Sequence, residues 1–68
     1  METEYDIFEV RPDMTIRWHI CVSGKKRALD ALKMVGLQTL NQCFAAELKT
    51  GEVIGWANKQ TAAPQTQK

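Results

Sequence analysis

The sequence predicts an α+β domain with the element order ββαββ: a four-stranded, mainly antiparallel sheet with one α-helix packed on one face. Three observations predict this fold. The 68 residues are 44% hydrophobic and 25% charged with a net charge of +1, which is typical of one globular domain and excludes a disordered chain or a disulfide scaffold. One segment with helical periodicity lies between two pairs of strand-like segments. Turn residues separate the members of each pair.

The first pair of segments predicts a β-hairpin. Residues 5–10 are rich in aromatic and β-branched residues, which favour a strand. Pro12 and Asp13 are typical turn residues and interrupt the pattern at residues 11–14. Residues 15–22 then alternate, which predicts a half-buried strand. Its two faces carry Ile16, Trp18, Ile20 and Val22 on one side and Arg17, His19 and Cys21 on the other.

The middle segment predicts one helix that begins at about Lys25. Ser23 is a suitable N-cap residue. An apolar stripe with helical spacing follows, formed by Ala28, Leu29, Leu32 and Val35. Gly36 favours a stop at that residue. Alternatively, the helix continues through Leu37 and Leu40, with Gly36 as an interior residue.

The second pair of segments predicts another hairpin. Residues 43–48 and 53–57 are the expected strands, and Gly51 suits the left-handed position of the turn at residues 49–52. Residues 1–58 therefore form the predicted domain. Residues 59–68 contain no large apolar side chain, so we expect a disordered polar tail there.

One helix covers only one face of such a sheet, so the other face is the first place to look for function. The predicted helix-facing set contains the larger side chains: Phe8, Val10, Ile16, Trp18, Ile20, Val22, Phe44, Leu48, Ile54 and Trp56. The uncovered set is mixed and contains His19, but it also includes several apolar or nearly apolar residues: Tyr5, Ile7, Cys21, Cys43, Ala45, Val53 and Ala57. An apolar patch of this kind marks an interface, unless it is a scatter of small residues that a monomer tolerates.

The leading hypothesis is therefore a small non-enzymatic interaction or assembly module that forms a homodimer or binds a protein partner through this face. The predicted contacts are Tyr5, Ile7, His19, Cys21, Ala45 and Val53. No motif specifies a substrate, and no cofactor is expected.

The start of the helix suggests an alternative, a phosphate-binding or nucleic-acid-binding accessory protein. The residues concerned are Lys25, Lys26, Arg27 and Lys33. Cations and free backbone N–H groups at a helix N-terminus can bind anions. Residues 1–24 carry a net charge of −3 and residues 25–68 a net charge of +4. This separation favours self-association as much as nucleic acid, and a solvated basic turn is the simpler interpretation.

A metal or cysteine site receives little support. His19, Cys21 and Cys43 are the soft ligand types, but their spacing matches no zinc pattern. Side chains two residues apart on a strand start about 6–7 Å apart, which is too far for a Cys–His nucleophile pair. The acidic Met1-Glu2-Thr3-Glu4 segment does not resemble a signal peptide, and no apolar run could span a membrane. We therefore expect a cytoplasmic protein with reduced thiols.

Overall fold

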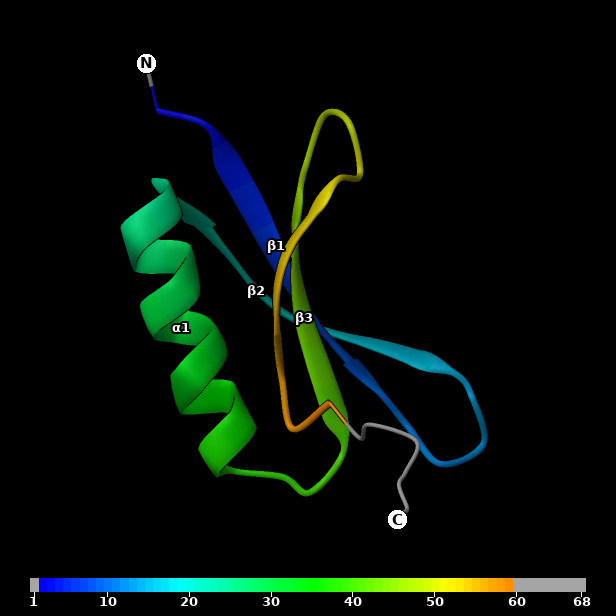
Figure 1. Cartoon of the computed structure of the whole chain (residues 1–68). Helices are drawn as coiled ribbons and strands as arrows, with labels where there is room; N and C mark the ends of the chain where they lie inside the picture. The colour runs from blue at the N-terminus through cyan, green and yellow to red at the C-terminus, as the bar shows by residue number, and fades with distance from the viewer. Residues whose placement is uncertain (1, 60–68) are drawn as a thin grey trace, which may run out of the picture.

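The computed structural model describes residues 2–59 and has the predicted ββαββ order. Its elements are β1 (Glu4–Val10), β2 (Ile16–Ser23), α1 (Lys25–Leu37), β3 (Gln42–Glu47) and β4 (Val53–Ala57). The strands form one antiparallel sheet in the order β2-β1-β3-β4, with α1 packed against one face (Figure 1). The α+β prediction is confirmed. The tail expected at residues 59–68 lies outside the described residues, apart from Lys59.

Both hairpin turns follow the local sequence. Gly51 adopts φ +76°, the left-handed conformation expected for the turn between β3 and β4. In the turn between β1 and β2, Asp13 accepts hydrogen bonds from the backbone N–H of Thr15 at 3.0 Å and from its hydroxyl at 2.7 Å. The turn hydrogen bonds fix the start of β2 relative to β1.

α1 begins at Lys25 as predicted, but its N-cap residue and its last residue differ from the prediction. Gly24, with φ 91°, is the N-cap residue, whereas Ser23 is the last residue of β2. The helix also continues past Gly36 and ends at Leu37. A Cβ at Gly36 would lie 2.8 Å from the Cβ of Ala57. Gly36 therefore permits the close approach of α1 to β4 and does not end the helix. Residues 2–59 contain one helix, α1, which is too short and too polar to cross a membrane.

Over most of the sheet, the helix covers the opposite face from the one predicted, although Ile54 packs against the core as expected. Ile7 of β1 and Cys43 and Ala45 of β3 are fully buried beneath it, against Leu32 and Val35. A Cβ at Gly55 of β4 would lie 3.0 Å from the Leu29 side chain. The helix thus packs closely over small side chains. The larger residues predicted to face it lie on the uncovered side: Phe8, Val10, Ile16, Trp18, Phe44 and Trp56.

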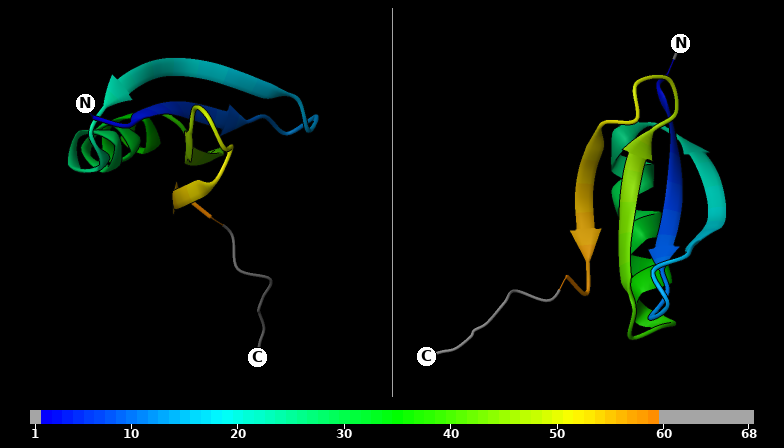
Figure 2. Two further views of the ribbon diagram at one scale, coloured as in Figure 1. Left: turned by 90° about the horizontal axis from the view of Figure 1, so that it is seen from above. Right: turned by 90° about the vertical axis from the view of Figure 1, so that its right-hand side faces the viewer.

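Strand β2 changes face part-way along its length. Its pairing with β1 shifts register between Ile7 and Phe8, which is a β-bulge. Ile20 pairs with Ile7 on the helix side, as predicted for Ile20, whereas Trp18 pairs with Phe8 on the uncovered side. Figure 2 shows this hairpin bending away from α1 towards the uncovered face. The prediction that one alternating set of β2 faces the helix throughout is therefore wrong.

Candidate interaction face

The uncovered face carries one aromatic side chain from each of the four strands. Trp18 of β2 pairs with Phe8 of β1, Phe8 pairs with Phe44 of β3, and Phe44 pairs with Trp56 of β4. The ring centroids of Phe8 and Phe44 are 5.2 Å apart, and those of Phe44 and Trp56 are 5.0 Å apart. We call these four residues the aromatic row. It crosses the whole sheet at one level, on the side facing the viewer in the right-hand panel of Figure 2.

The two ends of the row are the parts most exposed to solvent. Trp18 is 56% exposed and Trp56 is 42% exposed, while Phe8 and Phe44 between them are half-buried. Two further apolar residues, Ile16 of β2 and Val53 of β4, are exposed on the same face. Large aromatic and aliphatic side chains so placed form a patch of the kind that marks an interaction site.

Charged groups contact the row at both ends, with opposite signs. The indole Nε1 of Trp18 donates a hydrogen bond to Oδ1 of Asp6 at 3.1 Å. At the other end, Nζ of Lys59 lies 5.1 Å from the centroid of the Trp56 ring, within the range of a cation–π contact. Asp6 is on β1 and precedes Phe8, whereas Lys59 follows Trp56 of β4. Because β1 and β4 run in the same direction, these two charges lie on opposite sides of the row along the strands.

The predicted contact residues are only partly on this face. Tyr5, Ile7 and Ala45 are buried under α1, so their assignment to an uncovered face is wrong. The reason is the close helix packing, which selects small side chains at several sheet positions. Cys21, which pairs with Asp6, and Val53, which pairs with Ala46, do lie exposed on the uncovered face.

The remaining predicted contact, His19, belongs to a polar cluster around Glu9. Glu9 is only 7% exposed, and its carboxylate lies 2.8 Å from Nε2 of His19. It also accepts hydrogen bonds from the Thr39 hydroxyl at 2.8 Å and the Asn41 amide at 2.6 Å. These hydrogen bonds, from His19 first and then Asn41 and Thr39, lower the pKa of Glu9 from 4.5 to about 2.

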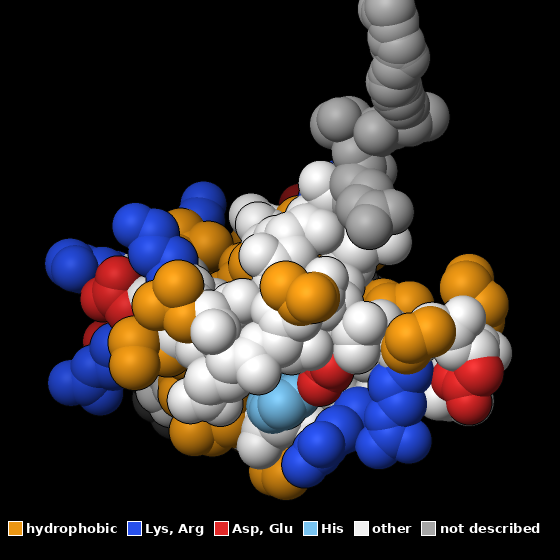
Figure 3. All heavy atoms as spheres, turned by 90° about the horizontal axis from the view of Figure 1, so that it is seen from below, with side chains coloured by type: hydrophobic (Ala, Val, Ile, Leu, Met, Phe, Trp, Pro, Cys, Tyr) orange, Lys and Arg blue, Asp and Glu red, His pale blue; other side chains and the backbone are white. Residues whose placement is uncertain are grey.

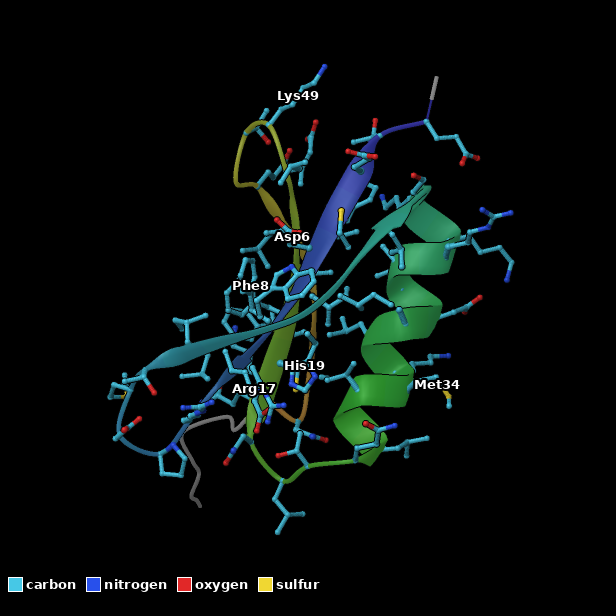
Figure 4. All side chains as sticks on the ribbon, turned by 180° about the vertical axis from the view of Figure 1, so that it is seen from behind. Asp6, Phe8, Arg17, His19, Met34 and Lys49 are labelled. Atoms are coloured by element: carbon cyan, nitrogen blue, oxygen red, sulfur yellow. The ribbon has the colours of Figure 1, made fainter. Side chains whose placement is uncertain are left out.

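The cluster joins three parts of the chain. Glu9 is on β1, His19 is at the bulge of β2, and Thr39 and Asn41 are in the connection between α1 and β3. Figure 4 shows Arg17 and His19 near the C-terminal end of α1, with Asp6 and Phe8 further along the sheet. In Figure 3 the imidazole reaches the surface beside an acidic side chain and close to Lys or Arg side chains. Sequence reasoning missed this cluster because its members are distant in sequence.

The three soft ligand residues do not come together. The bulge turns His19 towards Glu9, whereas Cys21 pairs with Asp6 on the uncovered face, so the prediction that they share a face is wrong. Partial desolvation, and then the negative charges of Asp6 and Glu4, raise the pKa of the exposed Cys21 thiol, while burial and the charge of Glu9 raise the pKa of Cys43. Within residues 2–59 no three His, Cys, Asp or Glu side chains are grouped to hold a metal ion.

The basic residues at the start of α1 are exposed but lie on the helix layer, away from the aromatic row. Lys26 is within 3.3 Å of Asp30, one turn further along α1. The helix N-terminus already faces an acidic side chain, because a Cβ at Gly24 would lie 3.4 Å from both carboxylate oxygens of Glu2. A carboxylate at this position interacts favourably with the helix dipole, and its negative charge repels a second anion.

Comparisons with protein-family models, with curated proteins and with solved structures find no match to this chain. The geometry of the sheet face and its surroundings is therefore what indicates a function.

Proposed function

We propose that the protein is a non-enzymatic interaction and assembly module that forms a homodimer by packing two uncovered sheet faces together. The observation that carries the proposal is the aromatic row. Aromatic side chains, Trp above all, are enriched at interfaces and among the residues that dominate binding energy. Two sheets packed face to face would give four layers, with a helix on each outer side.

The exposed area of the two tryptophans sets the scale of the interaction. A Trp side chain buries up to about 250 Å². Burying the exposed fractions of Trp18 and Trp56, 56% and 42%, then contributes about 6 kcal/mol per copy at about 25 cal/mol per Å². Association costs about 4–15 kcal/mol in lost rigid-body freedom and ordering. The burial free energy of the tryptophans of two copies together exceeds the lower part of that range. We therefore expect a dimer whose population rises with concentration.

The arrangement of the aromatic row favours a second copy of this chain as the occupant. A two-fold axis that lies between the sheets and runs parallel to the strands places β2 of one copy over β4 of the other. Trp18 of each copy then meets Trp56 of the other, and Phe8 meets Phe44. Because each exposed end of the row is covered by the opposite end of the partner's row, the face is complementary to itself.

A nucleic-acid role is less well supported by the same geometry. Stacking on Trp18 and Trp56 would need cations along the same face to hold the phosphates. The clustered cations Lys25, Lys26 and Arg27 instead lie on α1, in the opposite layer. Binding to DNA or RNA that weakens steeply with salt and is lost in the triple alanine variant of these residues would favour that alternative.

The proposal is tested by measuring the mass in solution by light scattering after size exclusion, over a range of concentrations. The wild type should approach twice 7.7 kDa as concentration rises, at low and high salt. Trp18→Arg should remain monomeric. The matched control Leu40→Arg alters another exposed apolar residue, in the connection between α1 and β3, and should still dimerise. A wild type that stays monomeric, or a Trp18→Arg variant that dimerises normally, would contradict the proposal.

A further inference from the structure

The strand at one edge of the sheet lies beside an apolar groove. Among residues 2–59, β4 pairs only with β3, so its other side is an open edge of this part of the structure. Between this edge and α1 is a groove of about 360 Å³. Leu29 and Leu32 of α1 and Gly55 of β4 line it, and Gly55 brings the strand backbone close to both leucines. Trp56 and Ala57 of β4 also line the groove, and its charged lining consists of Lys26, Lys33 and one carboxylate, Asp30, so that cations are in excess.

The two edges of the sheet differ in how well they are protected. The other edge strand, β2, carries Arg17 and His19 and a bulge, which are features that hinder pairing with a further strand. β4 has the sequence Val-Ile-Gly-Trp-Ala, with neither a charged residue nor a proline. Its register shift lies opposite Ala45 and Ala46, near the start of the strand, and leaves the pairing of residues 55–57 regular. β4 is therefore the edge suited to accept another strand.

We propose that the edge of β4 and the adjoining groove bind an extended acidic segment of another protein as a fifth strand of the sheet. Backbone hydrogen bonds to β4 would supply affinity, and alternate side chains would supply specificity. Apolar side chains of the segment would lie on Leu29 and Leu32, and its carboxylates would meet Lys26 and Lys33. The bond from Lys26 to Asp30 is solvent-exposed, with the Lys26 side chain 90% exposed, so this cation can turn to a ligand at little cost.

The charges also argue against a second copy at this edge. Pairing two β4 strands around a two-fold axis would place both helices on the same side of one continuous sheet. Each groove lining carries two lysines and one carboxylate, Asp30, so two facing linings with the same excess positive charge would repel each other. The inference is independent of the proposed homodimer, because packing of the sheet faces leaves the β4 edge open.

The binding test uses a fluorescent peptide of about eight residues that alternates Glu and Val, which is a typical strand length. The Glu-Val peptide should bind, as measured by fluorescence anisotropy at low ionic strength. A Lys-Val peptide should bind at least about fivefold more weakly, as expected for two exposed charge contacts. A Glu-Val peptide with every backbone amide methylated should not bind, because it cannot form the strand hydrogen bonds. Failure of the Glu-Val peptide to bind, or equal binding of all three peptides, would overturn the inference.

Variants and chemical shifts locate the site. Lys26→Glu/Lys33→Glu should reverse the preference between the two charged peptides, whereas Lys49→Glu in the exposed turn between β3 and β4 should leave it unchanged. Backbone amide shifts of Gly55 and Ala57 should move on titration. Shifts confined to β2 or to the aromatic row would overturn the assignment to β4. Repeating the titration with Trp18→Arg separates this inference from the homodimer, because that variant should still bind the peptide.

Discussion

Replacing Glu9 by Gln should remove most of the acid sensitivity of the fold. The folded carboxylate accepts hydrogen bonds from three side chains, and these lower its pKa from 4.5 to about 2. In the unfolded chain the same group takes up a proton near pH 4.5. The unfolded state therefore binds more protons between about pH 5 and pH 2, and stability falls as pH falls through that window. Above it, both states are ionised and this contribution is complete.

The pKa difference sets an upper limit on the effect. A depression from 4.5 to about 2, at 1.36 kcal/mol for each pKa unit, corresponds to about 3 kcal/mol. The imidazole of His19 is itself 19% exposed, so water screens part of the interaction. We therefore expect Glu9 to contribute about 2 kcal/mol at neutral pH. Such a loss is a large fraction of the few kcal/mol that stabilise a domain of this size.

Urea unfolding at a series of pH values measures this directly. The wild type should lose stability between pH 5 and pH 2, and the difference between wild type and Glu9→Gln should shrink over the same window. Glu52→Gln, at an exposed position in the turn before β4, should retain the wild-type pH dependence. If Glu9→Gln lost stability with acid as steeply as the wild type does, the role assigned to the cluster would be refuted.

Three further predictions concern packing, capping and thiol chemistry. Gly36→Ala should lower the free energy of unfolding by about 1–3 kcal/mol because its Cβ would lie 2.8 Å from that of Ala57, and urea unfolding should show partial rescue by Ala57→Gly. Asn58→Gly keeps the residue's positive φ but removes an amide that lies within 3.1 Å of three backbone carbonyl oxygens, one in the last turn of α1 and two after the helix; it should cost about 1 kcal/mol, and unchanged stability would refute the capping role. With a thiol reagent, the exposed Cys21 should react in the folded protein and the buried Cys43 only after unfolding; simultaneous labelling of both thiols at a native pH would contradict that placement.

Local signals in the sequence predicted the elements because each one depends on residues close together in the chain. The turn with Gly51 and the strand at residues 53–57 needed no tertiary information. The end of the helix could not be predicted without tertiary information. Gly36 resembles a stop signal by itself, and only the position of Ala57 shows that it permits close packing.

The sides of the sheet were not predictable from apolar alternation. β1 is apolar on both faces, with Ile7 on one and Phe8 on the other. Assigning the larger side chains to the core was wrong because α1 packs closely over small residues such as Cys43 and Ala45. A usable signal was present, since small residues alternate with the single aromatic residue of β3 and of β4. The bulge at His19 had no such signal.

The wrong assignment of side chains to the two sides of the sheet affects the predicted site residues more than the predicted fold. The prediction of a functional uncovered face depends on having one helix and four strands, and that architecture is confirmed. The residues on the face depend on strand register and on one bulge, which only the structure supplied. The homodimer remains a prediction, now assigned to the aromatic row.

Intermolecular NOEs in a mixture of isotope-labelled and unlabelled protein test the central claim most directly. At concentrations where the mass indicates dimers, filtered spectra should connect the Trp18 ring of one copy with the Trp56 ring of the other, and Phe8 with Phe44. Intermolecular NOEs that come only from α1 or from the β4 edge would contradict the proposed packing of one sheet face on another.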